Sequence, residues 1–198
     1  MVFKIILCIV IGYLLGSVVT AILVSNIFFK EDVRSHGSGN SGATNAARVY
    51  GLTYGILTFL GDFVKGIIAC WLGGLIAGPI GCAVAGFAGI IGHCFPVFFG
   101  FRGGKGVSVG AAFALMVDWR IFVIGIAIFI VLVAITKIVS AGSVCAIISV
   151  GVCSLIFPPE IAVKLMGLLA ALLVIAMHHA NIVRLLNGTE KRMTFGKR

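Results

Sequence analysis

Long apolar stretches dominate the chain, and short polar segments separate them. A helix that crosses the hydrocarbon core of a bilayer needs about 20 apolar residues. Charges and Pro/Gly clusters divide the chain into seven apolar stretches, at residues 5–29, 46–75, 79–99, 106–117, 121–136, 138–157 and 161–182. The pattern predicts an all-α integral membrane protein of about seven transmembrane helices. The stretch at 106–117 is short for a complete crossing, so five or six crossings remain open.

The amino-acid composition also indicates that lipid surrounds part of the protein surface. Hydrophobic residues make up 61% of the chain and charged residues only 11%, whereas a soluble domain has about 25% charged residues. Neither a repeat nor a linker interrupts the pattern. We therefore expect one polytopic membrane domain over residues 1–198.

The chain is basic, with a formal net charge of +9. Long apolar runs argue against nucleic acid as the partner. If seven stretches cross the membrane, eleven cations share one face: Lys30, Arg34, Arg48, Arg102, Lys105, Lys137, Arg184, Lys191, Arg192, Lys197 and Arg198. The opposite face has three, Lys4, Arg120 and Lys164. The positive-inside rule then predicts an outside N-terminus and a cytoplasmic C-terminus.

Two features inside the apolar stretches concern packing. The pairs Gly12/Gly16 and Gly74/Gly78 have the spacing that lets helix backbones approach closely in lipid. Asp62 and Lys65 lie three residues apart within one stretch. Because isolated charges are costly inside a membrane, we expect them to form a structural ion pair.

The first polar segment, residues 34–48, leads into the second apolar stretch. Its glycines Gly37, Gly39 and Gly42 allow positive φ and bring backbone N–H groups close to a ligand. A loop of this kind before a helix favours anions, and guanidinium groups at Arg34 and Arg48 match phosphate geometry. The segment also holds Ser38, Asn40, Ser41, Thr44 and Asn45. It predicts a phosphate-binding loop rather than an ordinary polar turn.

The second polar segment, residues 92–108, ends in the run Gly103-Gly104-Lys105-Gly106. This run is similar to a phosphate-cradling loop, with backbone N–H groups exposed to a ligand and with Lys105 and Arg102 as cations. It is not a Walker A motif, because that pattern requires Gly where this chain has Phe99 and Ser or Thr where it has Gly106. The ATPase interpretation therefore fails on spacing. For His93, packing and catalysis both remain open.

The third polar segment follows the last apolar stretch and contains His178, Asn181 and Arg184. On a helix, residues three or four apart share a face. The spacing thus predicts a histidine, an amide and a guanidinium that point the same way. The aqueous end of a helix explains the charges, but it explains the His-x-x-Asn spacing less well.

All three segments end at the same predicted membrane face. Several cations, Gly-rich turns and almost no acids indicate a pocket for phosphorylated ligands. A transporter of phosphorylated solutes is the alternative, and it would predict inverted halves, which the sequence does not display. A lipid-binding structural protein is a third, weaker class. Charges clustered at one face suit an enzyme that joins a lipid to a water-soluble acceptor, although from the residues alone enzyme and transporter are about even.

Together the three segments resemble the acyl-phosphate-dependent glycerol-3-phosphate acyltransferases of bacteria, the PlsY family. The resemblance rests on the run at 37–45 with Arg48, on the run at 92–106, and on the pattern His178-x-x-Asn-Ile-x-Arg-Leu-x-x-Gly-x-Glu190. It covers the whole chain in order. Three motifs in register are specific, whereas one alone would only be suggestive.

The resemblance implies a reaction. A fatty acyl phosphate from the bilayer would acylate the 1-hydroxyl of glycerol 3-phosphate, giving 1-acyl-glycerol 3-phosphate (lysophosphatidate) and phosphate. This is the first acylation step of bacterial phospholipid synthesis. The implied place is the bacterial cytoplasmic (inner) membrane, with the active site facing the cytoplasm and membrane lipid around it. No cofactor and no metal is implied, and a functional link to an acyl-phosphate-producing enzyme is expected.

The resemblance also implies site residues. Lys105, His178 and Asn181 are the implied catalytic residues. Arg48 and Lys105 should hold phosphate groups, and Lys105 should stabilise charge that develops in the transition state. The implied substrate-binding set is Ser38, Gly39, Asn40, Gly42, Thr44, Asn45, Arg48, Gly103, Gly104, Gly106 and Ser143, with Ser140 as the alternative to Ser143.

The general base is not evident. Other glycerolipid acyltransferases carry His-x4-Asp, but the residues five positions after the four histidines are Ser41, Phe98, Val183 and Arg184. Our hypothesis is that a substrate phosphate accepts the hydroxyl proton, with His178 as the alternative. Family members often have Arg and an acid where this chain has Met177 and Ala180, so no role is carried over to those two positions.

Overall fold

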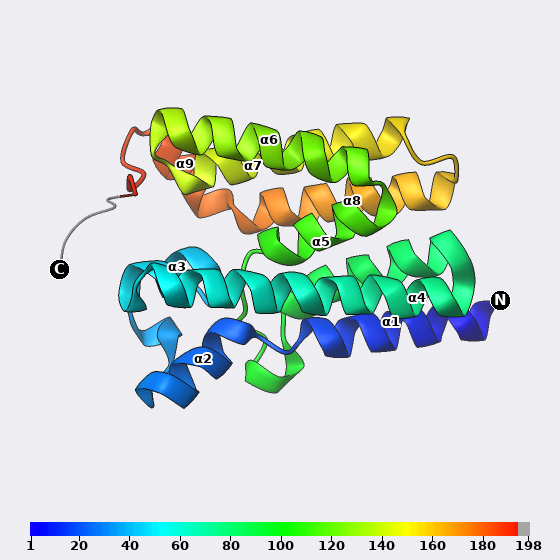
Figure 1. Cartoon of the computed structure of the whole chain (residues 1–198), viewed down its shortest axis with the longest axis horizontal. Coiled ribbons are helices and arrows are strands. Elements are labelled where there is room, and N and C mark those ends of the chain that lie inside the picture. Colours follow the sequence, from blue (N-terminus) through cyan, green and yellow to red (C-terminus); the bar gives the residue numbers. More distant parts are fainter. Residues whose placement is uncertain (194–198) are drawn as a thin grey trace.

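The computed structural model describes residues 1–193, and all regular structure in that range is helical. The elements are α1 (Val2–Gly16), α2 (Thr20–Phe29), η1 (Val33–Ser35), α3 (Ala43–Tyr50), α4 (Leu52–Cys94), η2 (Val97–Phe99), α5 (Val107–Val117), α6 (Trp119–Thr136), α7 (Val139–Ile156), α8 (Ile161–Met177) and α9 (His179–Leu186). The long helices lie side by side in an elongated bundle, with α5 in its middle (Figure 1). The all-α prediction is confirmed.

The long element α4 consists of two helices that fold back on each other. Its backbone leaves the helical region at Ala77 and at Gly78, where φ is 62°, and Pro79 follows. Lys65 Nζ lies 3.0 Å from His93 Nδ1 although 28 residues separate them, whereas a straight helix would hold them about 42 Å apart. We call residues 52–76 the first arm and residues 79–94 the second arm. The predicted division between 46–75 and 79–99 lies at this turn.

The expected count of seven full-length membrane helices is not confirmed. Four helical units within the described residues are long and apolar enough to cross a membrane, namely Val2–Phe29, Leu52–Phe99, Trp119–Thr136 and Val139–Ile156. A fifth is reached if α8 and α9, bent by 61°, count as one span. Two reasons lower the count: both arms of α4 fall into one unit, and α5 has only 11 residues, about 16 Å of helix.

Glycine brings α1 and the second arm of α4 into close contact. A Cβ on Gly12 would overlap the backbone of Ala85, and one on Gly16 would overlap the backbone of Gly89. The expected close approach at the first glycine pair is therefore confirmed. Gly78, from the second pair, instead takes the positive φ at which α4 reverses.

A second packing centre surrounds α5. Val109, Phe113 and Val174 of α8 are fully buried there, and Ile147 of α7 is nearly so. Four of the longer elements, α4, α6, α7 and α8, contact this short helix. The core therefore fixes α5, and with it the loop that precedes it.

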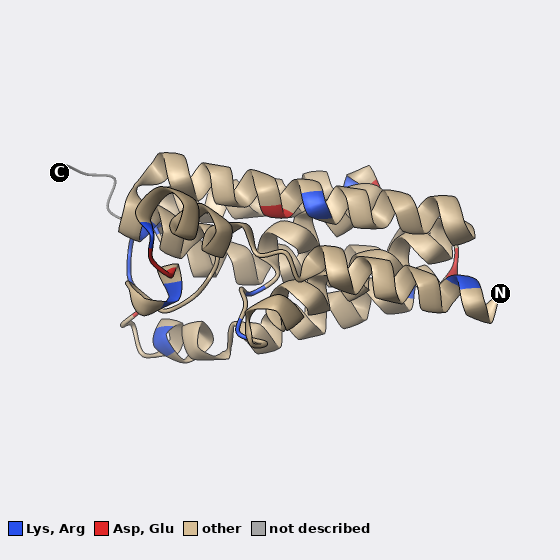
Figure 2. Cartoon of the chain, turned by 90° about the horizontal axis from the view of Figure 1, so that it is seen from below, with Lys and Arg blue, Asp and Glu red and all other residues tan. Residues whose placement is uncertain are grey.

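Charged residues are distributed unevenly along the bundle. Figure 2 shows Lys and Arg gathered mainly at the end where the polar loops lie, and few charges along the middle. Helix α9 lies at that polar end, and the N-terminus lies at the opposite end (Figure 1). Two of the eleven predicted cations, Lys197 and Arg198, lie outside the described residues.

Candidate active site

The three polar segments meet at one end of the bundle, as expected. Arg34 Nη1 donates to the backbone carbonyls of Phe99 at 2.7 Å and Arg102 at 2.9 Å, which joins the first segment to the second. Lys105 Nζ donates a short hydrogen bond to Asn181 Oδ1, which joins the second segment to the third. Lys105 and Asn181, which are 76 positions apart, are thus in direct contact, and the three segments form one polar site.

Asn45 organises the first segment. Its Oδ1 accepts from Ser38 N at 2.8 Å and from Ser38 Oγ at 3.1 Å, while its Nδ2 donates to the carbonyls of Val33 and His36. The side chain is 2% exposed. All of these bonds go to residues 33–38, within or directly before the first segment, so the amide that was predicted to bind substrate shapes the loop. Gly37, at φ 65°, packs against Asn45 Oδ1, and a Cβ there would overlap it.

The other predicted residues of the first segment lie closer to the surface. Ser38, Gly39, Thr44 and Arg48 are exposed, while Asn40 and Gly42 are half-buried. Gly42 directly precedes α3, so the loop enters a helix N-terminus as predicted. The side chain of Arg48 makes no hydrogen bond or ion pair with residues 1–193. It is therefore available to an anion.

The glycines of the second segment lie flat against the end of α4. Gly103 N–H donates to the carbonyl of Cys94 at 3.1 Å, and Gly104 N–H donates to the carbonyl of His93 at 3.0 Å. The expectation that these two N–H groups are exposed to a ligand is wrong, because the chain itself uses them. Gly106, at φ 84°, turns the chain into α5. The N–H groups in the first turn of α5 have no partner within their helix and follow Lys105 directly.

A polar cluster surrounds the Lys105–Asn181 contact. Glu190 Oε1 accepts from Asn181 Nδ2 at 2.7 Å and from Ser140 Oγ at 2.9 Å, and Glu190 Oε2 accepts from Arg184 Nε at 2.6 Å. We call Lys105, Ser140, Asn181, Arg184 and Glu190 the lysine cluster. One carboxylate thereby binds three side chains, from α7 and α9, next to the predicted catalytic lysine.

Electrostatics in the lysine cluster favour an anionic ligand. Burial lowers the pKa of Lys105; the Glu190 charge opposes this, and the Arg184 and Arg48 charges lower it further. Burial raises the pKa of Glu190, but its hydrogen bonds from Arg184, Asn181 and Ser140 outweigh that effect and lower it overall. With Arg48 counted, three cations therefore face one carboxylate, and a phosphate would relieve their mutual repulsion.

His178 lies at the break between α8 and α9. Its Nδ1 contacts the carbonyl of Val174 at 2.7 Å, and since a carbonyl only accepts, Nδ1 carries the proton. Nε2 is then an acceptor. The expected straight helix with His178, Asn181 and Arg184 on one face is replaced by the 61° bend, with His178 at its corner.

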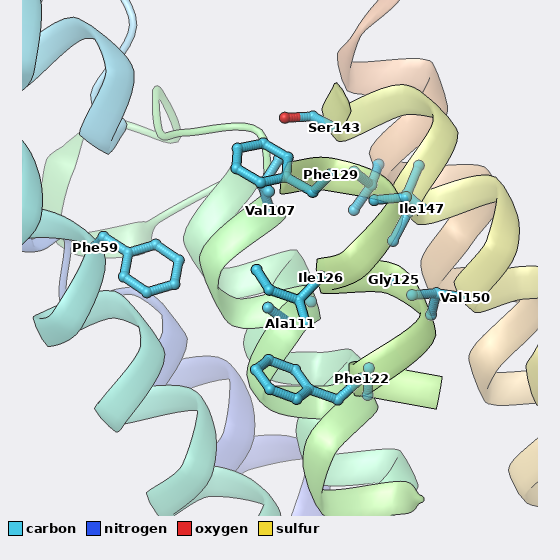
Figure 3. Close-up of a pocket in the computed structure, with 14 residues that line it drawn as sticks. Phe59, Val107, Ala111, Phe122, Gly125, Ile126, Phe129, Ser143, Ile147 and Val150 are labelled. Atoms are coloured by element: carbon cyan, nitrogen blue, oxygen red, sulfur yellow. The ribbon is translucent and has the colours of Figure 1, made fainter. Parts of the chain in front are cut away.

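An apolar groove is lined by residues that lie close in sequence to the lysine cluster, among them Val107 and Ser143. It runs between the first arm of α4 and helices α5 to α8 and encloses about 550 Å³ of space, part of it open to the surroundings. Figure 3 shows Ser143, Val107 and Phe129 near the loop before α5, and Phe122 and Val150 toward the other end. Its walls are otherwise aliphatic or aromatic. A groove of this kind suits a hydrocarbon chain.

Comparisons with known proteins agree with the motifs. The family model described as glycerol-3-phosphate acyltransferase matches residues 6–188. The chain belongs to this family. A glycerol-3-phosphate acyltransferase of Clostridioides difficile is 42% identical over 202 residues, covering 97% of each chain. Glycerol-3-phosphate acyltransferase 2 of Bacillus anthracis is 38% identical, covering 95% of this chain and 98% of the relative.

The same family accounts for the fold. A crystal structure of PlsY, an integral membrane glycerol 3-phosphate acyltransferase, in its glycerol 3-phosphate form superposes with a TM-score of 0.90 at 32% identity and covers 96% of both chains. The lysophosphatidic acid form of PlsY gives a TM-score of 0.87, covering 96% of this chain and 95% of that one. The predicted resemblance and the membrane class are thereby confirmed.

Two residues of this acyltransferase-family site were not assigned from the sequence. Glu190 appeared only as the last residue of the third motif. It is the one acidic residue of that segment, and its charge was the signal that could have marked it as a site residue. Ser140 was only the alternative to Ser143. Ser143 Oγ donates to the carbonyl of Val139 within its own helix and lines the apolar groove, whereas Ser140 belongs to the lysine cluster.

Proposed function

We propose that this protein transfers a fatty acyl group from acyl phosphate to the 1-hydroxyl of glycerol 3-phosphate, forming lysophosphatidate and phosphate. One observation carries the proposal: the apolar groove lies beside a cationic, Gly-rich polar site, because Val107, Ser143 and Val174 line the groove next to residues of that site. Such a site suits a reaction between a lipid chain and a phosphorylated, water-soluble acceptor. Membership of the glycerol-3-phosphate acyltransferase family supports the acceptor and the acyl transfer.

The residues that line the apolar groove lie close in sequence to residues of the polar site. Val107 lines the groove two residues after Lys105, and Val174 lines it while its carbonyl bonds to His178. Ser143 lines the groove less than one turn from Ser140 of the lysine cluster. An acyl chain in the groove would therefore present its carbonyl end to Lys105 and His178.

The chemistry then needs few protein groups. Arg48 and the first segment would bind the phosphate of glycerol 3-phosphate. Lys105 and the first turn of α5 would bind the phosphate of the donor. The acceptor oxygen attacks the acyl carbon, the bond from that carbon to the phosphate oxygen breaks, and Lys105 stabilises the charge on the leaving phosphate. A substrate phosphate takes the hydroxyl proton, and His178 Nε2 is the alternative acceptor.

The remaining predicted contacts fit around these groups. Ser38, Gly39, Asn40, Gly42 and Thr44 would contact the acceptor. Gly103, Gly104 and Gly106 would set the course of the chain at Lys105, and Asn181 would hold its ammonium group. Asn45 and Ser143 would act on the loop and on the groove, respectively. No step in this scheme calls for a metal or a cofactor.

We also propose the topology and the cellular setting. Counting each arm of α4 and the short α5, seven helical segments pass along the bundle, and the positive-inside rule places the lysine cluster at the cytoplasmic side of a bacterial inner membrane. Acyl phosphates are reactive, so a functional link to an enzyme that produces them follows.

The test uses purified protein in detergent with palmitoyl phosphate and glycerol 3-phosphate. We expect phosphate and lysophosphatidate to form only when both substrates are present. Lys105→Ala should lower the rate by roughly 100-fold or more, while Lys4→Ala, a cation at the opposite end of the bundle, should keep the wild-type rate.

Two results would contradict the proposal. Product from palmitoyl-CoA but not from palmitoyl phosphate would exclude the donor. No product from either donor, with folded protein in an assay where another family member works, would exclude the reaction.

A further inference from the structure

A charged network lies buried inside the bundle and shares no residue with the lysine cluster. Asp62, Lys65 and His93 are 1%, 8% and 2% exposed, respectively. Lys65 Nζ lies 2.8 Å from Asp62 Oδ1 and 3.0 Å from His93 Nδ1. The expected Asp62–Lys65 pair is confirmed, but His93 was not expected to join it. Ionisable groups inside a membrane protein are costly and therefore point to a function.

The hydrogen bonds of Lys65 define the state of the histidine. An ammonium group has three N–H donors, and Lys65 Nζ has three acceptors: Asp62 Oδ1, His93 Nδ1 and the carbonyl of Val18 at 2.5 Å. His93 Nδ1 must then accept. The ring is neutral with its hydrogen on Nε2, and its orientation is fixed by Lys65.

The network also anchors the break between α1 and α2. Val18 lies in that break, so its carbonyl lacks a helical partner and accepts from Lys65 instead. Asp62 Oδ1 accepts from Thr20 N at 3.3 Å and Thr20 Oγ1 at 3.0 Å, at the start of α2. The first arm of α4 thereby holds both sides of the break.

The other side of His93 supports the loop that carries Lys105. Gly104 N–H donates to the carbonyl of His93, and a Cβ on Gly104 would overlap His93 Nε2. A Cβ on Gly103 would overlap the carbonyl of His93. The glycine loop thus lies directly on the histidine, and Lys105 is the next residue along the chain.

We infer that Asp62, Lys65 and His93 are positioning residues for Lys105. Asp62 and Lys65 fix the imidazole of His93, the imidazole and the His93 carbonyl fix the two glycines, and the glycines set where the Lys105 ammonium group stands relative to Asn181. This inference rests on the proposed acyl transfer, in which Lys105 acts on the leaving phosphate. If Asp62, Lys65 and His93 only packed the helices together, apolar side chains of similar volume would do so equally well.

The first test compares His93→Phe with His93→Asn. Phenylalanine keeps a ring under Gly104 but removes the acceptor for Lys65, whereas the asparagine amide oxygen can still accept. We expect His93→Phe to lower kcat by roughly 30- to 100-fold, as a misplaced catalytic group does, with KM for glycerol 3-phosphate changed less than about threefold. His93→Asn should recover at least part of kcat. Rates are normalised to folded protein, measured by thermal unfolding.

The second test probes the contact itself. Gly104→Ala places a Cβ against His93 Nε2 and should lower kcat, but in combination with His93→Asn the smaller side chain leaves room for it. We expect kcat of the double variant to be higher than the value obtained by multiplying the two single effects on kcat. Gly74→Ala is the control, because a Cβ there meets only Cys82 Cβ at 3.7 Å.

The outcomes separate this inference from the proposed function. A wild-type protein without acyl transfer would contradict the function. An active wild type with His93→Phe within about twofold of its kcat would overturn the positioning role. If His93→Phe does not fold, the Gly104→Ala cycle decides: additive effects reject the contact, and non-additive effects support it.

Discussion

At the scale of single residues, the charge state of Lys105 depends on its neighbours more than on its motif. Lys105 donates a hydrogen bond to Asn181, and the negative charge of Glu190 raises the pKa of Lys105. The positive charges of Arg48 and Arg184 lower that pKa. A glycine-rich Lys motif alone indicates anion binding. The surrounding charges decide the pH range over which the lysine stays protonated.

Removing the Glu190 charge should shift the pH dependence of the reaction. Glu190 raises the pKa of Lys105, so Glu190→Gln should lower that pKa further below 10.5, its ordinary value. Because the reaction as proposed needs the ammonium form, the alkaline limb of kcat/KM should move to lower pH. The measurement is the pH–rate profile of both proteins with palmitoyl phosphate.

A matched variant tests whether the shift is local. Lys137 is exposed at the same end of the bundle, and Lys137→Gln should leave the alkaline midpoint in place. An alkaline limb of Glu190→Gln that coincides with that of the wild type would exclude the electrostatic role of this carboxylate.

At the scale of elements, interruptions of helices build the site. The break between α8 and α9 places His178 at a corner, the reversal of α4 brings His93 under the glycine loop, and the short α5 starts beside Lys105. Continuous helices of full length would carry these side chains elsewhere. The same short helix forms one wall of the apolar groove.

Narrowing the groove should change acyl-chain preference. Ala111 of α5 lines it, and Ala111→Leu fills part of the space with three added carbons. We expect the rate with palmitoyl phosphate to fall at least tenfold relative to the rate with octanoyl phosphate, since the longer chain needs more of the groove. The measurement is kcat/KM for both donors.

A leucine outside the groove is the control. Ala134 of α6 is exposed and is not part of the groove wall, so Ala134→Leu should keep the wild-type ratio of the two rates. Equal loss with both donors in Ala111→Leu would show that the groove does not hold the acyl chain.

At the scale of the whole molecule, the bundle has one polar, cationic end and one end with few cations (Figure 2). The three motifs and helix α9 lie at the cationic end, and the N-terminus lies at the other. An odd number of passes along the bundle would give this arrangement. In the topology that we propose, the cationic end faces the cytoplasm.

Thiol labelling in intact cells tests that orientation. Val2 and Asn187 are exposed near opposite ends of the chain. In a Cys145→Ser background, a membrane-impermeant maleimide should label the thiol introduced by Val2→Cys from outside, and that from Asn187→Cys only after the membrane is opened. The reverse pattern would invert the proposed topology.

Much of this protein could be predicted because the signals are local. Apolar runs predict membrane helices, and the Gly-rich motifs with Arg48 and Lys105 predict an anion site. The close contact at Gly12 and Gly16 and the Asp62–Lys65 pair also followed from spacing within one helix. Each of these depends on residues a few positions apart, where helix geometry fixes the distance.

The sequence by itself determined the membrane class and the family, and it named the residues to which we assign the proposed chemistry. Only the tertiary structure decided that Asn45 shapes its own loop, that the glycine N–H groups are bonded to the end of α4, and that Ser140 and Glu190 join Lys105. The physical reason is that each partner depends on the course of the chain in space: how the loop before α3 folds, where α4 ends, and how α7 meets the segment after α9. Composition and periodicity do not encode those points.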